Sequence, residues 1–310
     1  MRPQAVSALL SLAAPLAGLQ LESPLPKEGV PFRITLEEEN DKFGADNVDR
    51  YYTQGLRLTL QSGDHAYLAI AQEINTPSDI SNPNPPDTDM AYSGALYLAY
   101  GHGHVFERGG RKDVLVSVEL KLGVIGPSSG AETIQNKFHD LIGQPAAAGW
   151  GRQTPDEPMI NLDGELRRRF GDDHLDFIAR SVLQLGSMRT GFAVGGQLRY
   201  GRGLGTSWGT GTIRGSNAYL GPLTVAEGFR WHLFADAQAE AVISNYATDG
   251  GHFEESPGVD RRPVVGQASV GAALAYGDFT LSVFSAVRTY EFETQTEAHH
   301  FGGFKAGMQF

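Results

Sequence analysis

Two polar side chains near the middle of the chain have the types and the spacing needed for acid–base chemistry. Gln135 and His139 are four residues apart, in a segment where Ile134 and Phe138 show the same spacing. Residues four apart project from one face of a helix. Histidine is the side chain whose pKa suits a general base near neutral pH. The pattern predicts a short amphipathic helix over 130–143, whose histidine is either a catalytic base or a structural or solvated residue.

A second cluster of polar residues lies earlier in the chain. Three glutamates precede Asn40 and Asp41, and Asp46 and Asp49 follow shortly after. Carboxylate and amide oxygens gathered at the end of a strand are hard ligands that suit calcium. The spacing does not match an EF-hand, and a solvated acidic loop is the plainer explanation of an isolated acidic run.

The elements that must position these residues are β-strands. Apolar and polar residues alternate within 56–61, 114–122 and 229–241, so that each segment has one apolar and one polar face. Long strands of this kind are typical of a transmembrane β-barrel, with lipid outside and a polar lumen. A soluble sandwich or a lipocalin-type barrel also gives alternation. The charged second faces and the aromatic last residue, Phe310, favour the membrane form.

The alternating segments number about twelve. They predict an all-β fold, an antiparallel transmembrane barrel of about 12 strands with the short helix between strands 5 and 6. The expected strands are 31–39, 54–62, 65–75, 91–103, 113–124, 157–169, 175–187, 191–201, 227–245, 263–276, 279–293 and 301–310.

The composition agrees with a membrane barrel. With 39 glycines and 41% hydrophobic residues, a chain of 310 residues has little material for a soluble core. The chain has no cysteine, which excludes disulfides, thiolate metal ligands and cysteine nucleophiles. Its 25 basic and 36 acidic residues give a net charge of −11, which argues against a nucleic-acid partner.

The N-terminus has the pattern of an export signal. Residues 1–18 contain one arginine, then an apolar segment rich in alanine and leucine, then small residues. A short N-terminal helix packed on the domain would explain the same segment. We expect a signal peptide over 1–18 and a single barrel domain over 19–310, located in the bacterial outer membrane.

Three sequence blocks carry a resemblance to a known family. They are 39–41 (END), 49–56 (DRYYTQGL), and 123–150, which runs from Gly-Val-Ile-Gly-Pro through the helix to Gly-Trp. On these blocks the chain resembles the lipid A 3′-O-deacylases, which are twelve-stranded barrels of the bacterial outer membrane. The resemblance extends from about residue 32 to the last residue, and it is most specific in the first half.

The resemblance implies a calcium-dependent esterase that acts on lipid A in lipopolysaccharide, among the lipids of the outer membrane. It implies that His139 is the general base that activates a water and that Gln135 positions the substrate or water. Asn40 and Asp41 would lie at the metal and oxyanion site, with Asp41 as a metal ligand, and Thr53 would line the same pocket. A calcium ion can stabilise a developing oxyanion as a Lewis acid, so no serine or cysteine nucleophile is needed. We expect a monomer.

The chain departs from the family pattern at two places. The resemblance leads us to expect a glutamate six residues after the helix histidine, as part of the metal site, but this position is Pro145. Glu157 or Asp140 could take its role. A lysine expected in the loop after the third strand is not evident within 76–89.

Two other functions are compatible with the sequence. The same histidine and calcium chemistry would serve a phospholipase-like esterase. A non-catalytic barrel, either a porin or a structural protein, is the alternative of another class. Large charged groups on the inner faces, such as Arg57 and Lys121, favour a filled lumen over an open pore.

Overall fold

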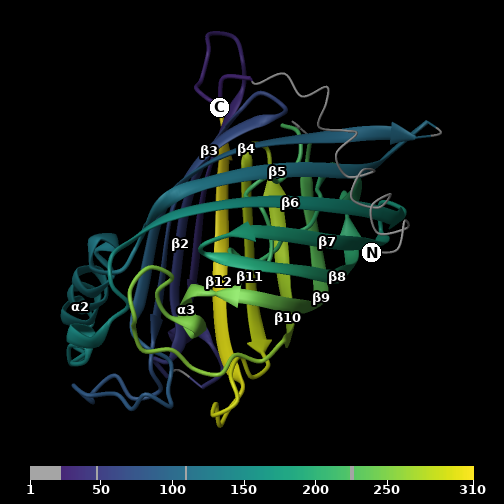
Figure 1. Ribbon diagram of the computed structural model, residues 1–310. Coiled ribbons are helices and arrows are strands. Elements are labelled where there is room, and N and C mark those ends of the chain that lie inside the picture. Colours follow the sequence, from purple (N-terminus) through teal and green to yellow (C-terminus); the bar gives the residue numbers. More distant parts are fainter. Residues whose placement is uncertain (1–21, 47, 109, 224–226) are drawn as a thin grey trace, which may run out of the picture.

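The computed structural model describes residues 22–46, 48–108, 110–223 and 227–310. Within these residues, antiparallel strands form one closed barrel in which β1 pairs with β12 (Figure 1). The strands are β1 (Phe32–Asn40), β2 (Tyr51–Ser62), β3 (Ala66–Thr76), β4 (Ser93–Arg108), β5 (Arg111–Ile125), β6 (Glu157–Gly171), β7 (Leu175–Gly186), β8 (Arg189–Arg202), β9 (Phe229–Asn245), β10 (Val264–Tyr276), β11 (Phe279–Arg288) and β12 (His299–Gln309). The predicted twelve-stranded barrel is confirmed.

In the part of the chain that the structure describes, helices occupy short segments between the strands. They are η2 (Asp41–Phe43), η3 (Pro127–Ser129), α2 (Ala131–Leu141), η4 (Trp150–Arg152), η5 (Leu204–Thr206) and α3 (Tyr246–Asp249). The predicted helix between strands 5 and 6 is therefore confirmed as α2. In the described parts of the chain, no helix has the length and hydropathy needed to cross a membrane.

The alternation of residue types becomes an alternation of faces in the barrel wall. In β9, Leu233 and Ile243 are exposed on the outside, whereas Asp236 and Glu240 are buried in the lumen. Successive side chains of a strand point to opposite faces, which explains the period of two. The wall is therefore apolar outside and polar inside, as a barrel surrounded by lipid requires.

The two ends of the barrel differ in their connections. The end where β1 begins and β12 finishes has tight turns, such as 172–174 and 277–278, and we call it the turn end. The opposite end, the loop end, carries long connections that include 77–92 and 126–156. In bacterial outer-membrane barrels the short turns are periplasmic and the longer loops are extracellular.

The lumen is filled by paired charges. Buried arginine and lysine side chains each have a carboxylate partner across or along the strands, and most of the N–O separations lie between 2.7 and 3.0 Å. The pairs are Arg57–Glu37, Lys121–Asp163, Arg167–Glu165, Arg180–Asp236, Arg199–Asp176, Arg214–Glu73, Arg288–Glu240 and Lys305–Glu37.

One connection at the turn end does not form a tight turn. Residues 203–223, which we call the plug segment, follow β8 and run inside the lumen. Their hydrogen bonds reach β1, β2, β3, β5, β6, β8 and β10, through Ile213–Glu39, Arg57–Ser216, Arg214–Glu73, Ala218–Glu119, Asn217–Glu165, Gln197–Thr210 and Gln267–Thr212. The lumen is filled, as expected, but the sequence does not predict the plug segment, because this segment has no periodic pattern.

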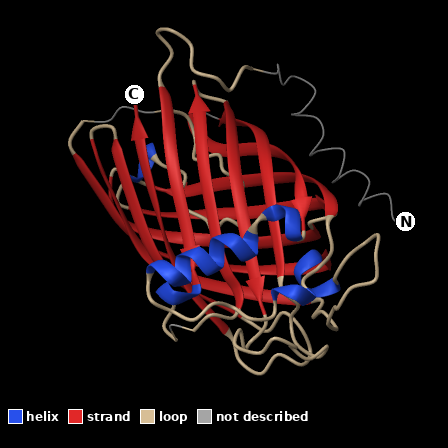
Figure 2. Ribbon diagram, turned by 90° about the vertical axis from the view of Figure 1, so that its left-hand side faces the viewer, coloured by secondary structure: helices blue, strands red, loops and turns tan. Residues whose placement is uncertain are grey.

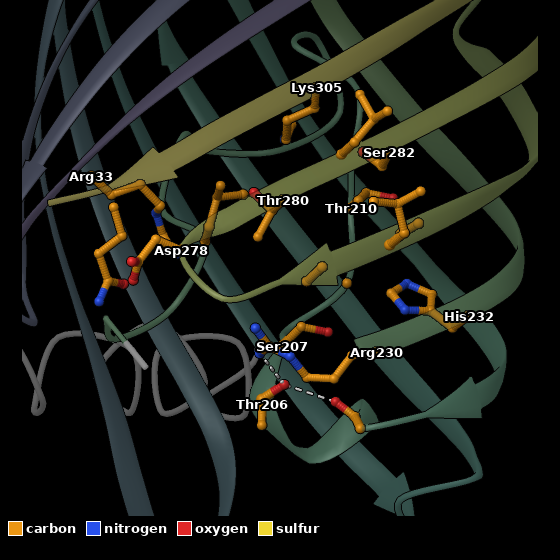
Figure 3. Close-up of a pocket in the computed structure, with 18 of the residues that line it drawn as sticks. Arg33, Thr206, Ser207, Thr210, Arg230, His232, Asp278, Thr280, Ser282 and Lys305 are labelled. Carbon is orange, nitrogen blue, oxygen red and sulfur yellow. Dashed lines mark hydrogen bonds between the residues drawn. The ribbon is translucent and has the colours of Figure 1, made fainter. Parts of the chain in front are cut away.

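A cavity remains beside the plug segment at the turn end (Figure 3). Arg33, Arg230, His232 and Lys305 line it, together with Thr206 and Ser207 of the plug segment. Arg230 donates to the hydroxyl of Thr206 at 3.0 Å. None of the residues predicted for catalysis or metal binding lines this cavity.

The predicted boundaries need two clear corrections. The fourth strand is expected over 91–103, but β4 continues to Arg108. We expected the eleventh strand over 279–293, but β11 ends at Arg288. The residues beyond it bond to the neighbouring loop, where Arg262 N donates to Glu291 O at 2.8 Å and Glu293 N donates to Asp260 O at 2.8 Å. Backbone pairing outside the barrel thus replaces the expected strand end. The proposed signal peptide over 1–18 lies outside the described residues.

Candidate functional site

Helix α2 lies against the outside of the barrel wall (Figure 2). It follows η3, and Gln72 of β3 holds this turn by donating from Nε2 to Ser129 O at 2.7 Å. Gly94 of β4 allows the close approach, since a Cβ at this position would lie 2.3 Å from the Cβ of Ala131. The helix is therefore seated on β3 and β4 through a small-residue contact.

The side of α2 that faces the wall is polar. Its buried residues are Ala131, Gln135 and His139, which recur every fourth residue. The two polar side chains are 3% and 2% exposed. This confirms that Gln135 and His139 share one face of a helix. Their burial shows that the barrel fixes them in place.

His139 has a defined orientation. Its Nδ1 lies 2.7 Å from the carbonyl oxygen of Pro145. Because a carbonyl only accepts, Nδ1 carries the hydrogen, and Nε2 of the neutral ring keeps its lone pair. Nε2 faces the carboxylate of Asp49, whose Oδ2 lies at 3.5 Å. Pro145 thus contributes its main-chain oxygen to the site, although its side chain cannot bind a metal.

The loop from Asp41 to Arg50 brings two carboxylates to this histidine. Asn40 caps η2 by accepting from Lys42 N at 2.9 Å. Asp41 Oδ2 accepts from Arg50 N at 2.7 Å, while its buried Oδ1 has no hydrogen-bond partner among the described residues. Burial, and then the nearby Asp49 carboxylate, raise the pKa of Asp41 well above its usual range. Asp49 pairs with Lys42 Nζ at 2.9 Å.

Gln135 is held by an aromatic residue from the far end of the same connection. Its Oε1 accepts a hydrogen bond from Trp150 Nε1 at 2.8 Å. The Trp150 ring packs on Tyr92, with ring centroids 4.8 Å apart. Because the oxygen of the amide is engaged, its Nε2 group is the free end, and this buried donor has no partner in the described structure.

Thr53 lies at an irregularity of β2. The pairing with β3 shifts register between Tyr52 and Gln54, so Thr53 is the extra residue of a β-bulge. Its hydroxyl lies 2.7 Å from that of Thr76. Tyr52 points into the lumen, where it donates to Glu39 at 2.8 Å. Thr53 follows it on the outer face, the face on which α2 lies.

The structure brings some of the predicted residues together and leaves others apart. Asp41 and His139 both adjoin Asp49, and Gln135 shares the buried stripe of the helix. No hydrogen bond joins Asn40 or Thr53 to His139 in the described residues. Asp49 was recognised in the acidic cluster but not selected as a site residue, although its position just before β2, opposite the end of β1, could have identified it.

The donor set for a metal is partial. Among the described residues, no group of three or more histidine, aspartate or glutamate side chains is arranged to hold a metal ion. The unpartnered Oδ1 of Asp41 is nevertheless a buried carboxylate oxygen without a counter-charge in contact. Burying a carboxylate oxygen without a partner costs free energy, and a bound cation would remove this cost. Glu157, named as a substitute ligand, instead accepts from Phe253 N at 2.7 Å.

The chain matches one protein family by sequence and several solved structures by fold. The family profile described as "Outer membrane protein LpxR" matches residues 6–310. LpxR from Salmonella typhimurium superposes with a TM-score of 0.76 at 20% identity, covering 89% of this chain and 99% of that structure. The β domain of the Bordetella autotransporter BrkA gives 0.43 at 14% identity, with 91% and 98% covered. A search of curated proteins found no match.

Proposed function

Because the chain belongs to the family of the outer membrane protein LpxR, we propose that it is a lipid A deacylase, which hydrolyses an ester-linked acyl chain of lipopolysaccharide. Its place is the bacterial outer membrane, as the family and the twelve-stranded barrel establish. The observation that carries the proposal is the orientation of His139, whose Nδ1 is bonded to Pro145 O and whose Nε2 faces the acidic loop.

The position of the site supports a lipid substrate. His139 and Gln135 lie between the outer face of the wall and α2, not in the lumen. A lipid that diffuses in the outer leaflet reaches this face without passing through the barrel. The plug segment does not separate the site from the membrane, since its bonds are made inside the barrel.

Ester hydrolysis can be written with the residues of this chain. His139 Nε2 accepts a proton from a water, and the water oxygen bonds to the ester carbonyl carbon. The free amide group of Gln135 is available to donate to the water or to the ester oxygen that gains negative charge. The bond between the carbonyl carbon and the sugar oxygen then breaks, and Nε2 returns its proton to this sugar oxygen. The products are a fatty acid and the deacylated lipid.

Calcium is part of the proposal. Asp41 would hold the ion through its free oxygen, and Asp49 would supply the second carboxylate in place of the glutamate expected at Pro145. When bound, the ion supplies a Lewis acid for the negative charge that develops on the ester. Asp49 pairs with Lys42 Nζ through Oδ2, at 2.9 Å, so the ion would compete with this lysine for Oδ2 or be held by Oδ1.

Mass spectrometry of lipopolysaccharide incubated with the purified protein tests the proposal. We expect calcium-dependent loss of one acyl chain from lipid A by the wild type and no loss with His139→Gln. His300→Gln is the matched control, because His300 is a partly exposed loop-end histidine whose Nε2 lies 4.0 Å from Asp46. Unchanged lipid A with folded protein would refute the activity.

The same assay separates the two other candidate functions. Release of fatty acid from glycerophospholipids, with lipid A left intact, would identify a phospholipase-like esterase. A porin requires an open lumen, but the plug segment bonds to seven strands across it. We therefore expect no ion conductance in planar bilayers.

A further inference from the structure

Helix α2 exposes its apolar side chains instead of burying them. Ile134, Phe138, Leu141 and Ile142 are all exposed, and Leu141 is 81% exposed. At 100° per residue, Ile134, Phe138 and Leu141 form one stripe, about a quarter turn around the helix from the buried stripe. Ile142 is the C-cap residue that follows the helix. The remaining side of the helix carries exposed polar residues, including Glu132 and Lys137.

The loop that meets His139 extends this apolar surface. Phe43 and Val48 lie between Asp41 and Asp49 in the sequence and are exposed, Phe43 by 53%. Exposing a large apolar side chain to water costs about 1.5–3 kcal/mol relative to burying it. A cluster of six such residues around one site therefore indicates an apolar environment, and single exposed residues elsewhere would not.

The wall beneath the helix shows which environment this is. Helix α2 contacts β3 and β4. The outer faces of these strands carry Ile70 and Leu98, of which Leu98 is 61% exposed. These side chains belong to the band that faces lipid in a membrane barrel. The helix thus lies on two strands that carry this lipid-facing band. A helix with one apolar and one charged side is the type that lies in a membrane interface.

We propose that α2 and the 41–50 loop insert their apolar side chains into the outer leaflet of the membrane, among its acyl chains. A consequence, which rests on the proposed function, is that the inserted helix holds Gln135 and His139 at the depth of the ester bonds. A second copy of the chain on this surface is an alternative outcome of the test.

The absence of cysteine from the sequence makes the test direct. A polarity-sensitive fluorophore is attached to the single-cysteine variants Leu141→Cys, Thr133→Cys and Leu98→Cys of the full chain in phospholipid vesicles. Leu141 probes the stripe, Thr133 probes the polar side of the same helix, and Leu98 is the lipid-facing reference. Folding of each variant is checked by heat-dependent mobility in gels.

We expect phospholipids with nitroxide-labelled acyl chains to quench the probe at Leu141 as strongly as the probe at Leu98. The probe at Thr133 should be quenched by iodide in the water. If iodide quenches the probe at Leu141 and the lipid quencher does not, the insertion is wrong. Protection from both quenchers, with disulfide-linked dimers of Leu141→Cys, would indicate a second copy and would equally overturn it.

A kinetic arm tests the consequence for substrate. Leu141→Glu should raise the apparent KM for vesicle-embedded lipopolysaccharide about tenfold with kcat unchanged. Thr133→Glu adds the same charge on the polar side and should change neither constant. An unchanged KM for Leu141→Glu would overturn the positioning role. If the wild type releases no fatty acid, the proposed function fails, while the quenching result still decides the lipid contact.

Discussion

On the inner face of the barrel wall, Glu39 accepts hydrogen bonds from Tyr52 at 2.8 Å and from Ile213 N at 2.7 Å. On the outer face, a few residues away, Asp41 Oδ1 and Gln135 Nε2 are buried without a partner. Single polar atoms without a partner also occur in the lumen, such as Thr59 Oγ1 and Asn217 Oδ1. Most lumen carboxylates, however, lie within ion-pair distance of an arginine or lysine, whereas no ion pair is formed by Asp41 in the described residues.

This difference indicates that the lumen residues stabilise the fold, whereas the residues of the outer site serve function. A buried ion pair is costly to break, because the remaining charge loses its partner in a low dielectric. An unpartnered buried polar atom already carries a cost, and it persists where the surrounding fold imposes it. The ion pairs of the lumen and the plug segment stabilise the barrel wall. The wall in turn fixes the positions of Asp41 and of the buried α2 residues, whose unpartnered polar atoms are unfavourable until a substrate or ion binds them.

The largest expected effect is on activity at the outer face. His139→Ala should lower kcat/KM on lipopolysaccharide by about 10²–10⁴, which is the usual contribution of a general base. Its urea unfolding midpoint should fall only modestly, because the substitution removes one hydrogen bond, from Nδ1 to Pro145 O, and only a long contact of 3.5 Å to a carboxylate. Fatty acid release and unfolding are measured on the same preparation. A large loss of stability with retained activity would contradict the assignment of function to the outer face and of stability to the lumen.

The reverse result is expected at the inner face. Arg214→Ala should lower the free energy of unfolding by about 3–5 kcal/mol, because it leaves Glu73 buried without its partner. Arg152→Ala is the control, since its pair with Asp87 is exposed and should contribute at most about 1 kcal/mol. Both are measured by urea titration in detergent. Equal midpoints for the two variants would show that the lumen pairs do not stabilise the barrel.

The period-two pattern made the barrel predictable, and the four-residue spacing made α2 predictable. Both patterns arise because a local repeat decides which side chains share a face. Gln135 and His139 were found for this reason. The orientation of the helix was not predictable, since an amphipathic helix normally buries its apolar side, whereas α2 buries the polar one.

The plug segment and Asp49 show what a local pattern cannot give. Residues 203–223 have no repeat, and their place in the lumen is set by bonds to residues up to 174 positions away, such as Ile213 N to Glu39. Asp49 belongs to the site because η2 and the following loop return the chain to α2. Both depend on long-range packing.

A smaller effect is expected at the contact between α2 and the wall. Gly94→Ala places a Cβ 2.3 Å from the Cβ of Ala131, so the helix must shift. Overpacking of this kind costs about 1–3 kcal/mol, and the shift should reduce activity by moving His139 away from the acidic loop. Gly164→Ala in β6 is the control, because a Cβ there meets nothing within 4 Å. Full activity of Gly94→Ala would show that the seating of the helix does not position the histidine.

The smallest expected effect has the opposite sign. Burial and Asp49 raise the pKa of Asp41 above its usual value of about 3.9, so the folded protein keeps a proton that the unfolded chain has lost. The contribution of Asp41 to stability is therefore greatest at low pH. It falls as the pH rises from the pKa of Asp41 in the unfolded chain to its higher pKa in the folded protein. In calcium-free buffer Asp41→Asn should be more stable than the wild type at pH 8 by about 1 kcal/mol, and the difference should vanish near pH 4. Urea titrations across this range measure it, with the exposed Glu132→Gln as the control for a lost charge. If Asp41→Asn is instead less stable than the wild type, the Asp41 carboxylate already has stabilising partners in the folded protein. The contrast between a paired lumen and an unpaired outer site would then not include Asp41.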